Sequence, residues 1–132
     1  MYLSSPEGGM RLHFVETRVF TWRVQALRLE GELRALPHRL IEHPDAGDLD
    51  PGTGGLRKIR LGDPARGKGK RGGARVHYLW LPNHAVVYLM FIYTKAEADS
   101  LEPAQKRELR MVVDRIKSEW DRRAAASRRH DK

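Results

Sequence analysis

The sequence predicts an α+β fold, a small antiparallel sheet that carries two helices from the N-terminal part of the chain and one C-terminal helix. Apolar residues recur at helical spacing over residues 18–42 and again over residues 103–126. Between these regions, three runs rich in β-branched and aromatic residues are separated by turn-forming residues, which is typical of strands. Consecutive strands with short connections pair antiparallel. At 132 residues, the chain is expected to form one domain.

The N-terminal elements are expected to be a strand followed by two helices. Residues 11–16 (RLHFVE) alternate in polarity and predict a short strand, the first of the sheet. Thr17 can cap a helix that begins at about Arg18. Gly31 is expected to divide the helical region in two. Pro37 has no amide donor, so it either kinks the second helix or lies in its first turn.

The middle of the chain is expected to hold a loop and three consecutive strands. Residues 43–55 contain two prolines and four glycines, which indicates a loop. Residues 62–73 form a glycine-rich basic connection, and Pro-Asn-His at 82–84 predicts a tight hairpin. The three strands are expected at residues 56–61, 75–81 and 86–93.

Alternation along residues 75–81 assigns side chains to two faces of the predicted sheet. Arg75 and His77 share one face with Leu79 and Leu81, and the residues between them take the other. Both faces carry large side chains. We therefore expect helices to cover one face and the function to lie on the other.

The C-terminal part is expected to be a helix over residues 103–126, with Pro103 in its first turn. Residues 11–120 are expected to form the domain, residues 1–10 a flexible leader with Met10 as an alternative start, and residues 121–132 a basic tail that frays. The apolar stripe of the helix is expected to consist of Leu109, Val112, Val113, Ile116 and Trp120.

The composition favours a polyanionic partner. Lys and Arg number 25 against 17 Asp and Glu, so the formal charge is +8. Such a balance suits nucleic acid, an anionic membrane surface or an acidic protein. Cysteine is absent, which fits a reducing compartment, and we expect a cytoplasmic protein. No apolar run approaches the ~20 residues of a membrane helix, so no membrane partner is expected.

The positive charge is concentrated in one stretch. Eight of the 25 Lys and Arg residues fall between residues 57 and 75, where Asp63 is the only acid. Clustered cations with interspersed glycines are typical of phosphate contact, and we favour nucleic-acid binding over a merely solvated loop. His77 shares a face with Arg75 and borders the predicted site. The candidate RNA-binding residues are Arg57, Lys58, Arg60, Arg66, Arg71 and His77.

Two other kinds of site are disfavoured by the sequence. Residues 62–69 (GDPARGKG) nearly match a phosphate-binding loop, but Gly69 replaces the hydroxyl residue and a strand follows instead of a helix. The six histidines show no metal-binding spacing. We therefore expect no metal, cofactor or small-molecule ligand.

RNA is favoured over DNA, and the cations suit its cleavage. Neither N-terminal helix has the basic face of a helix-turn-helix motif. The aromatic residues Tyr78, Trp80, Tyr88 and Tyr93 lie instead on strands beside the cations, where unpaired bases stack, although Trp80 and Tyr88 are more simply core residues. RNA carries its own nucleophile, the 2′-OH, so cleavage needs a base, cations on the phosphate and an acid. The candidate catalytic residues are Lys68 or Lys70 as base, with Arg75, Tyr93 and Lys95.

Two sequence blocks extend this interpretation. Residues 67–78 (GKGKRGGARVHY) follow the pattern G-K-G-K-x-G-G-x-R-V-x-Y, and residues 93–101 (YTKAEADSL) follow the pattern Y-x-K-x-E-x-x-x-L. Both blocks resemble the RelE superfamily of toxins, in its HigB-like branch. The resemblance covers residues 11 to about 120.

The resemblance implies a toxin of a type II toxin–antitoxin system, an mRNA interferase that cleaves messages in the ribosome and inhibits growth. It also implies a cognate antitoxin, usually a helix-turn-helix protein. By position, Lys68 and Lys70 fall on the basic-loop lysines of the family, one of which acts as base. Arg75 falls on the arginine that contacts the scissile phosphate. Lys95 falls on the lysine after the last strand.

The chain departs from the family at the position of the acid. Better-known members carry an arginine just after that lysine and a tyrosine further on, whereas this chain has Ala96 and, near the second position, Glu102. The general acid is therefore unmatched, with Tyr93 or Lys95 as its substitute. Two alternatives stay open, namely an RNA- or ribosome-binding module without catalysis and a regulatory subunit that docks an acidic partner.

Overall fold

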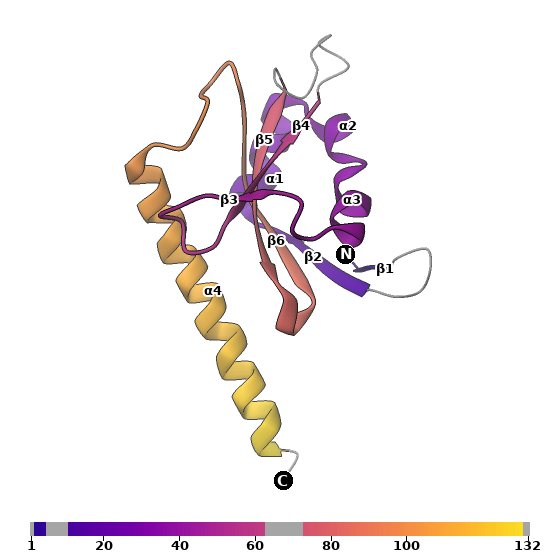
Figure 1. Ribbon diagram of the computed structural model, residues 1–132, viewed down its shortest axis with the longest axis vertical. Helices are drawn as coiled ribbons and strands as arrows, with labels where there is room; N and C mark the ends of the chain where they lie inside the picture. Colours follow the sequence, from indigo (N-terminus) through magenta and orange to yellow (C-terminus); the bar gives the residue numbers. More distant parts are fainter. Residues whose placement is uncertain (1, 5–10, 63–72, 131–132) are drawn as a thin grey trace.

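The computed structural model of this chain describes residues 2–4, 11–62 and 73–130. It confirms the α+β class, with one sheet and helices from both ends of the chain (Figure 1). The elements in chain order are β1 (Tyr2–Ser4), β2 (Arg11–Glu16), α1 (Arg18–Leu27), α2 (Glu30–Leu33), α3 (Leu36–Glu42), β3 (Asp48–Leu49), β4 (Arg57–Leu61), β5 (Ala74–Leu81), the 3-10 turn η3 (Pro82–His84), β6 (Val86–Thr94) and α4 (Pro103–His130).

The sheet is mixed, which corrects the expectation of a purely antiparallel one. The strand order of the described residues is β1-β2-β6-β5-β4-β3, and β4, β5 and β6 pair antiparallel as predicted. The pairing of β2 with β6 is parallel. Antiparallel pairing is enforced only between strands joined by a short turn. The long chain between β2 and β6 leaves their relative direction to the packing of the helices.

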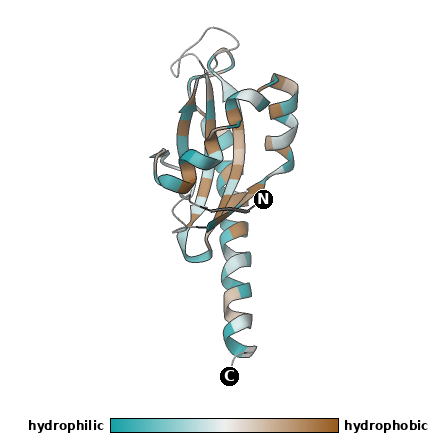
Figure 2. Ribbon diagram, turned by 90° about the vertical axis from the view of Figure 1, so that its right-hand side faces the viewer, coloured by the Kyte–Doolittle hydropathy of each residue, from teal (hydrophilic) through white to brown (hydrophobic). Residues whose placement is uncertain are grey.

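Two predicted boundaries also shift. Tyr2–Ser4, assigned from the sequence to a flexible leader, pair antiparallel with β2 as β1. The C-terminal helix does not end near residue 126 but continues to His130, and its last turns project beyond the sheet (Figure 2). No helix within the described ranges is both long enough and apolar enough to cross a membrane.

The N-terminal helices begin as predicted but divide at another residue. The Thr17 hydroxyl accepts a hydrogen bond from the Phe20 amide at 3.1 Å and caps α1. The helix ends at Leu27, and the next residue, Arg28, adopts a left-handed conformation with φ 55°. Gly31 lies within the short helix α2 and does not separate the helices. Pro37 lies in the first turn of α3, where its missing amide costs nothing.

One face of the sheet forms the larger core with α1 and α3. From β5, this face takes Val76, Tyr78 and Trp80, as the alternation predicted. Tyr78 is fully buried, and its hydroxyl donates to the Pro44 carbonyl at 2.7 Å while it accepts from the Gly47 amide at 2.9 Å. Tyr78 thus fixes the loop before β3 against the centre of the sheet.

The opposite face is covered in part by α4, so helices lie on both sides of the sheet and not on one. Leu79 of β5 and Met90 of β6 pack against the fully buried Val113 of α4. Figure 1 shows α4 along one side of the sheet, leaving the upper ends of β4 and β5 uncovered by a helix. Val112, predicted to be in the apolar stripe, is partly exposed instead.

A bulge in β6 changes which side chains reach this second face. His77 pairs with Phe91 and Tyr78 pairs with Leu89, so Met90 is the extra residue. Leu89 packs in the larger core, while Met90 packs against α4. The extra residue shifts the alternation, so that Phe91 and Tyr93 lie on the same face as His77.

Replacement of Tyr78 by phenylalanine should destabilise the protein by about 1–3 kcal/mol, because a buried amide and a buried carbonyl would lose their partner. Urea unfolding of the Tyr78→Phe variant measures this loss. Tyr88→Phe is the matched control, since the Tyr88 hydroxyl accepts one hydrogen bond from Trp120 in a part-buried position. An equal loss in the two variants would contradict the anchoring role of Tyr78.

Candidate nucleic-acid interface

Three polar side chains form a row across the uncovered end of the second face. Arg60 of β4 pairs with Arg75 of β5, and Arg75 pairs with Tyr93 of β6. Directly paired residues of antiparallel strands point to the same side, with Cβ atoms about 4.5–5.5 Å apart. The register therefore places the Cβ atoms of two arginines and a tyrosine side by side on one face, as the sequence predicted for Arg75 and Tyr93.

A second row lies one step further along the same strands. Lys58 pairs with His77, and His77 pairs with Phe91. The His77 ring stacks on Tyr93 with a centroid separation of 5.7 Å, and Phe91 contacts Tyr93 at 6.0 Å. The two rows together form the candidate site, a set of three Lys and Arg side chains and three rings, of which Arg75, His77 and Tyr93 are buried.

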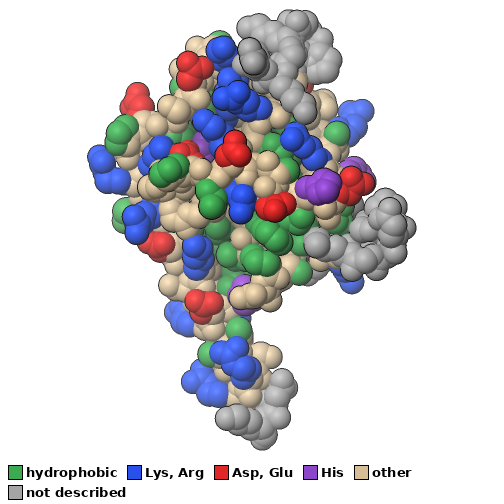
Figure 3. Space-filling view, viewed as in Figure 1, with side chains coloured by type: hydrophobic (Ala, Val, Ile, Leu, Met, Phe, Trp, Pro, Cys, Tyr) green, Lys and Arg blue, Asp and Glu red, His purple; other side chains and the backbone are tan. Residues whose placement is uncertain are grey.

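The pairing of Arg60 with Arg75 is unfavourable by itself. Like charges directly opposite each other in a sheet destabilise the pair. No carboxylate forms an ion pair with Arg60 or Lys58 among the described residues. A bound anion would remove this repulsion. Figure 3 shows Lys and Arg side chains gathered at the upper end of this face, over β4 and β5.

Gly73 holds the end of β5 to the end of β6. Its carbonyl accepts from the Arg75 guanidinium at 2.9 Å and from the Lys95 amide at 3.2 Å. A side chain at residue 73 would collide with the Leu61 carbonyl, so only glycine fits between β4 and β5 here. The basic connection predicted from the sequence therefore joins strands whose ends, Leu61 and Ala74, are paired beside Lys95.

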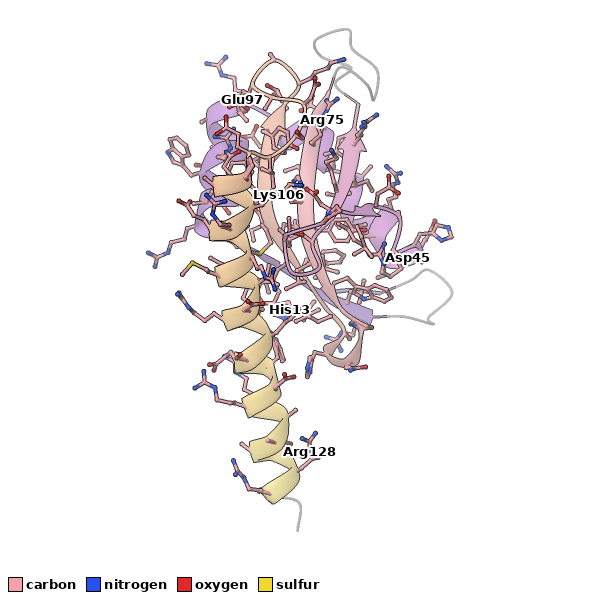
Figure 4. The ribbon with its side chains drawn as sticks, turned by 60° about the vertical axis from the view of Figure 1, so that its left-hand side comes forward. His13, Asp45, Arg75, Glu97, Lys106 and Arg128 are labelled. Atoms are coloured by element: carbon pink, nitrogen blue, oxygen red, sulfur yellow. The ribbon has the colours of Figure 1, made fainter. Side chains whose placement is uncertain are left out.

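A partly buried hydrogen-bond network of Asp50, His77 and Lys106 lies next to the site. Asp50, in the loop after β3, accepts from His77 Nε2 at 2.8 Å and from Lys106 Nζ of α4 at 2.8 Å. Burial opposes the charge of Asp50, but the hydrogen bonds from Lys106 and His77 outweigh it and lower the pKa of this carboxyl. Figure 4 shows Lys106 on the first turns of α4 and Arg75 nearer the end of its strand.

His77 is neutral near pH 7, and its ring lies in the interior of the protein, where it stacks on Tyr93. Burial lowers the pKa of His77, and the hydrogen bond to Asp50 offsets this only in part. The ring is fully buried, so the direct RNA contact predicted for His77 would require a local rearrangement, as it would for Arg75 and Tyr93. Nε2 donates to Asp50, and Nδ1 has no hydrogen-bond partner within the part of the chain that the structure describes.

Tyr93 is suited to donate a proton or a hydrogen bond. Burial, together with the charge of Asp50, raises its pKa to about 12. The phenol therefore stays protonated at neutral pH and cannot serve as a base. Its hydroxyl is buried without a hydrogen-bond partner among residues 2–4, 11–62 and 73–130.

The members of the site differ in their accessibility. Arg60 and Lys95 are exposed and Lys58 is half-buried. Arg75 and Tyr93 are each only 3% exposed. In this conformation, a polyanion meets Arg60, Lys58 and Lys95 first, and contact with Arg75 or Tyr93 requires a local rearrangement.

Several predicted site residues lie elsewhere. Arg57 is on the opposite face, where its guanidinium donates to the Gly47 carbonyl at 2.8 Å and holds the loop before β3. Alternation along β4 separates it from Arg60. Tyr78, expected to offer a stacking surface, is a core residue on that same opposite face. Lys68, Lys70, Arg66 and Arg71 lie outside the described residues.

The sequence did not reveal Asp50 and Lys106. Asp50 lies in a loop of prolines and glycines, and Lys106 is one of many cations on α4. Their meeting depends on the docking of α4, which Lys117 also secures by donating to the Gly54 carbonyl. The only local indication of a role for Asp50 was its place next to a segment in which Thr53 and the glycines favour a compact turn.

A scan of the chain against models of known protein families found no model that matches.

The His77–Asp50 pair makes the protein sensitive to acid. Between the ordinary histidine pKa of 6.5 and the lower value in the fold, the unfolded chain binds a proton that the folded chain does not. Stability should therefore fall as the pH drops below 6.5, by at most about 1.4 kcal/mol per pH unit for this proton. Asp50 adds a further loss below its ordinary value of 3.8.

Thermal unfolding of the wild type and His77→Gln between pH 7.5 and 4.5 tests this prediction. The variant should show a flatter dependence in that range. His13→Gln is the comparison variant, because burial also lowers the pKa of His13. It measures how much of the acid sensitivity comes from this second histidine and not from His77. Parallel curves for the wild type and His77→Gln would exclude His77 as the source of the acid sensitivity.

Proposed function

We propose that this protein is an RNA-cleaving toxin of a toxin–antitoxin system, an mRNA interferase that acts in the ribosome without a metal ion. The RelE-like resemblance of residues 67–78 and 93–101 motivates the class of activity. The α+β fold with three consecutive antiparallel strands is compatible with it. In this proposal, a helix-turn-helix antitoxin neutralises the chain.

The row of Arg60, Arg75 and Tyr93 is the observation that carries the proposal. It sets two arginines of neighbouring strands next to a buried, protonated phenol whose hydroxyl has no hydrogen-bond partner among the described residues. A phosphate between the two guanidinium groups would neutralise the repulsion and accept charge-assisted hydrogen bonds. The same phosphate would then lie next to the Tyr93 hydroxyl.

The chemistry assigns a separate task to each group. The 2′-OH attacks the adjacent phosphorus, and a base removes its proton. Arg75 and Arg60 hold the phosphate oxygens as negative charge develops. Tyr93, which is protonated at neutral pH, donates the proton that the leaving 5′ oxygen needs. The base is assigned to Lys68 or Lys70 from the sequence alone, and Lys95 follows the end of β6.

Binding of RNA or of the ribosome without cleavage is the second candidate function. It is favoured by the burial of Arg75 and Tyr93, which leaves Arg60, Lys58 and Lys95 as the accessible cations of the described site. It is also favoured by Ala96, which stands where the toxins that the chain resembles carry the arginine that acts as acid. Cleavage products distinguish the two candidates.

Primer extension on a message translated by purified ribosomes tests the proposal. The wild type should produce new 5′ ends within codons of the message bound to the ribosome. Arg75→Ala should reduce the cleavage rate about 100-fold or more, because it removes a donor from the developing charge. Tyr93→Phe should reduce it while leaving binding intact.

Because Arg75 is buried, Arg75→Ala can also lose activity by unfolding, so variants of exposed arginines are needed for comparison. Arg60→Ala changes an exposed side chain of the same row and should lower cleavage without unfolding the protein. Arg115→Ala removes an exposed arginine of α4 and should have no effect. Binding without new 5′ ends would leave the second candidate. Full cleavage by Arg60→Ala and Tyr93→Phe would remove the catalytic assignment.

The salt dependence of RNA binding provides a separate measurement. Each phosphate neutralised on a single strand contributes a slope of about −0.7 to log affinity against log salt. Arg60→Ala should make the slope shallower by about that amount, whereas Arg57→Ala should not, since Arg57 lies on the opposite face. An unchanged slope in Arg60→Ala would show that RNA binds elsewhere.

A further inference from the structure

An apolar groove lies between α1, β6 and α4, beside the candidate site. Its volume is about 310 Å³. Val19 of α1 and Val112 of α4 form its two walls, and Met90 and Phe91 of β6 form its floor. Phe91 also contacts Tyr93, so the groove adjoins the candidate site without sharing its cations.

The two helices that flank the groove carry unusual exposed apolar surface. Val19 is 52% exposed, Trp22 follows one turn later at 65%, and Val112 is 37% exposed. Contiguous exposed apolar groups around a groove mark interaction sites. Leu49, 61% exposed on β3, lies at the other edge of the sheet and offers a matched control.

The adjacent sheet edge is closed to a further strand. β2 pairs with β6 only as far as Leu89, so the edge of β6 beyond this residue has no strand beside it among the described elements. Thr17 Oγ1 donates to the Met90 carbonyl at 3.1 Å, and Arg23 Nε donates to the Ile92 carbonyl at 2.5 Å. These side chains occupy the acceptors that an added strand would need. A partner must therefore bind through side chains, as an amphipathic helix does in a groove.

The charge of the flanking helices selects the partner. In α4, nine Lys and Arg residues stand against four Asp and Glu, and α1 contains two arginines and no acid. Exposed cations adjoin the groove in sequence, with Arg18 next to Val19 and Arg115 one turn after Val112. Glu108 is the single acidic lining residue. A second copy of this chain would be repelled by the shared charge of +8.

We propose that this groove binds an acidic amphipathic helix of another protein, whose apolar side chains enter between Val19 and Val112. Its carboxylates lie toward the cations of α1 and α4. This surface is separate from the row of Arg60, Arg75 and Tyr93, and the proposal does not depend on RNA cleavage.

The absence of cysteine allows a site-specific test on the full-length chain. Val112→Cys and, as control, Leu49→Cys each carry a single environment-sensitive fluorophore. The probe is a synthetic helical peptide with leucine at positions i, i+4, i+7 and i+11 and mostly glutamate elsewhere. Saturable blue-shifted emission at residue 112, without a change at residue 49, is expected. A peptide with lysine in place of glutamate should not produce this shift.

Charge reversal within the groove completes the test. Val19→Glu and Val112→Glu should weaken binding of the labelled peptide at least about tenfold, whereas Leu49→Glu should not. Val19 lies in the first turn of α1, where an acidic side chain is compatible with the helix dipole, so this variant should fold. Both groove variants should retain any RNA cleavage, and Arg60→Ala should retain peptide binding.

Any of four results of the peptide experiments would overturn the proposal. They are no saturable binding of the acidic peptide, equal binding of the lysine peptide, unchanged affinity in both groove variants, and equal binding of a peptide with serine in place of leucine. Sedimentation of the wild type as a dimer that Val112→Glu dissociates would show that a second copy occupies the groove, which also overturns it.

Discussion

The alternation of side chains along β5, held between β4 and β6, determines what each face of this sheet can do. Val76 and Tyr78 enter the core with α1 and α3, and this commits Arg75 and His77 to the other face. A register slip of one residue would bury Arg75 in the larger core and expose Tyr78. The hydrogen bonds of the Tyr78 hydroxyl to the loop before β3 oppose such a slip.

The second face contains two sets of polar side chains, namely the Asp50 network and the row of Arg60, Arg75 and Tyr93. In the Asp50 network, the Asp50 carboxylate accepts from both Lys106 and His77, whereas Nδ1 of His77 has no partner among the described residues. In the row above it, Arg60 stands directly opposite Arg75 across the strand pair. Local rules of stability are commonly violated where a protein binds its ligand. The Asp50 network and the row of Arg60, Arg75 and Tyr93 therefore lie on the same face, and this is where we propose that RNA binds.

The sequence was sufficient for features that depend on neighbouring residues, such as the Thr17 cap, the three central strands and the meeting of Arg75 with Tyr93. It was insufficient where distant segments decide. The parallel pairing of β2 and the contact of Lys106 with Asp50 both depend on how helices dock. Strict alternation also could not reveal the bulge at Met90, which turns Phe91 and Tyr93 toward the cations. The sequence also grouped Arg57 with the other cations of the site, although Arg57 lies on the opposite face. A count of cations along the chain does not show which face of the sheet each one occupies.

The central claim is that the row across β4, β5 and β6 receives the ribose–phosphate backbone. NMR titration with a single-stranded RNA blocked by 2′-O-methyl groups tests it most directly, because binding is observed without cleavage. The account predicts that the guanidinium signals of Arg60 and Arg75 and the ring signals of Tyr93 shift together and saturate at one RNA concentration. The side chain of Arg57 should stay unchanged. Shifts confined to α4, or equal shifts of arginines on both faces, would contradict the account.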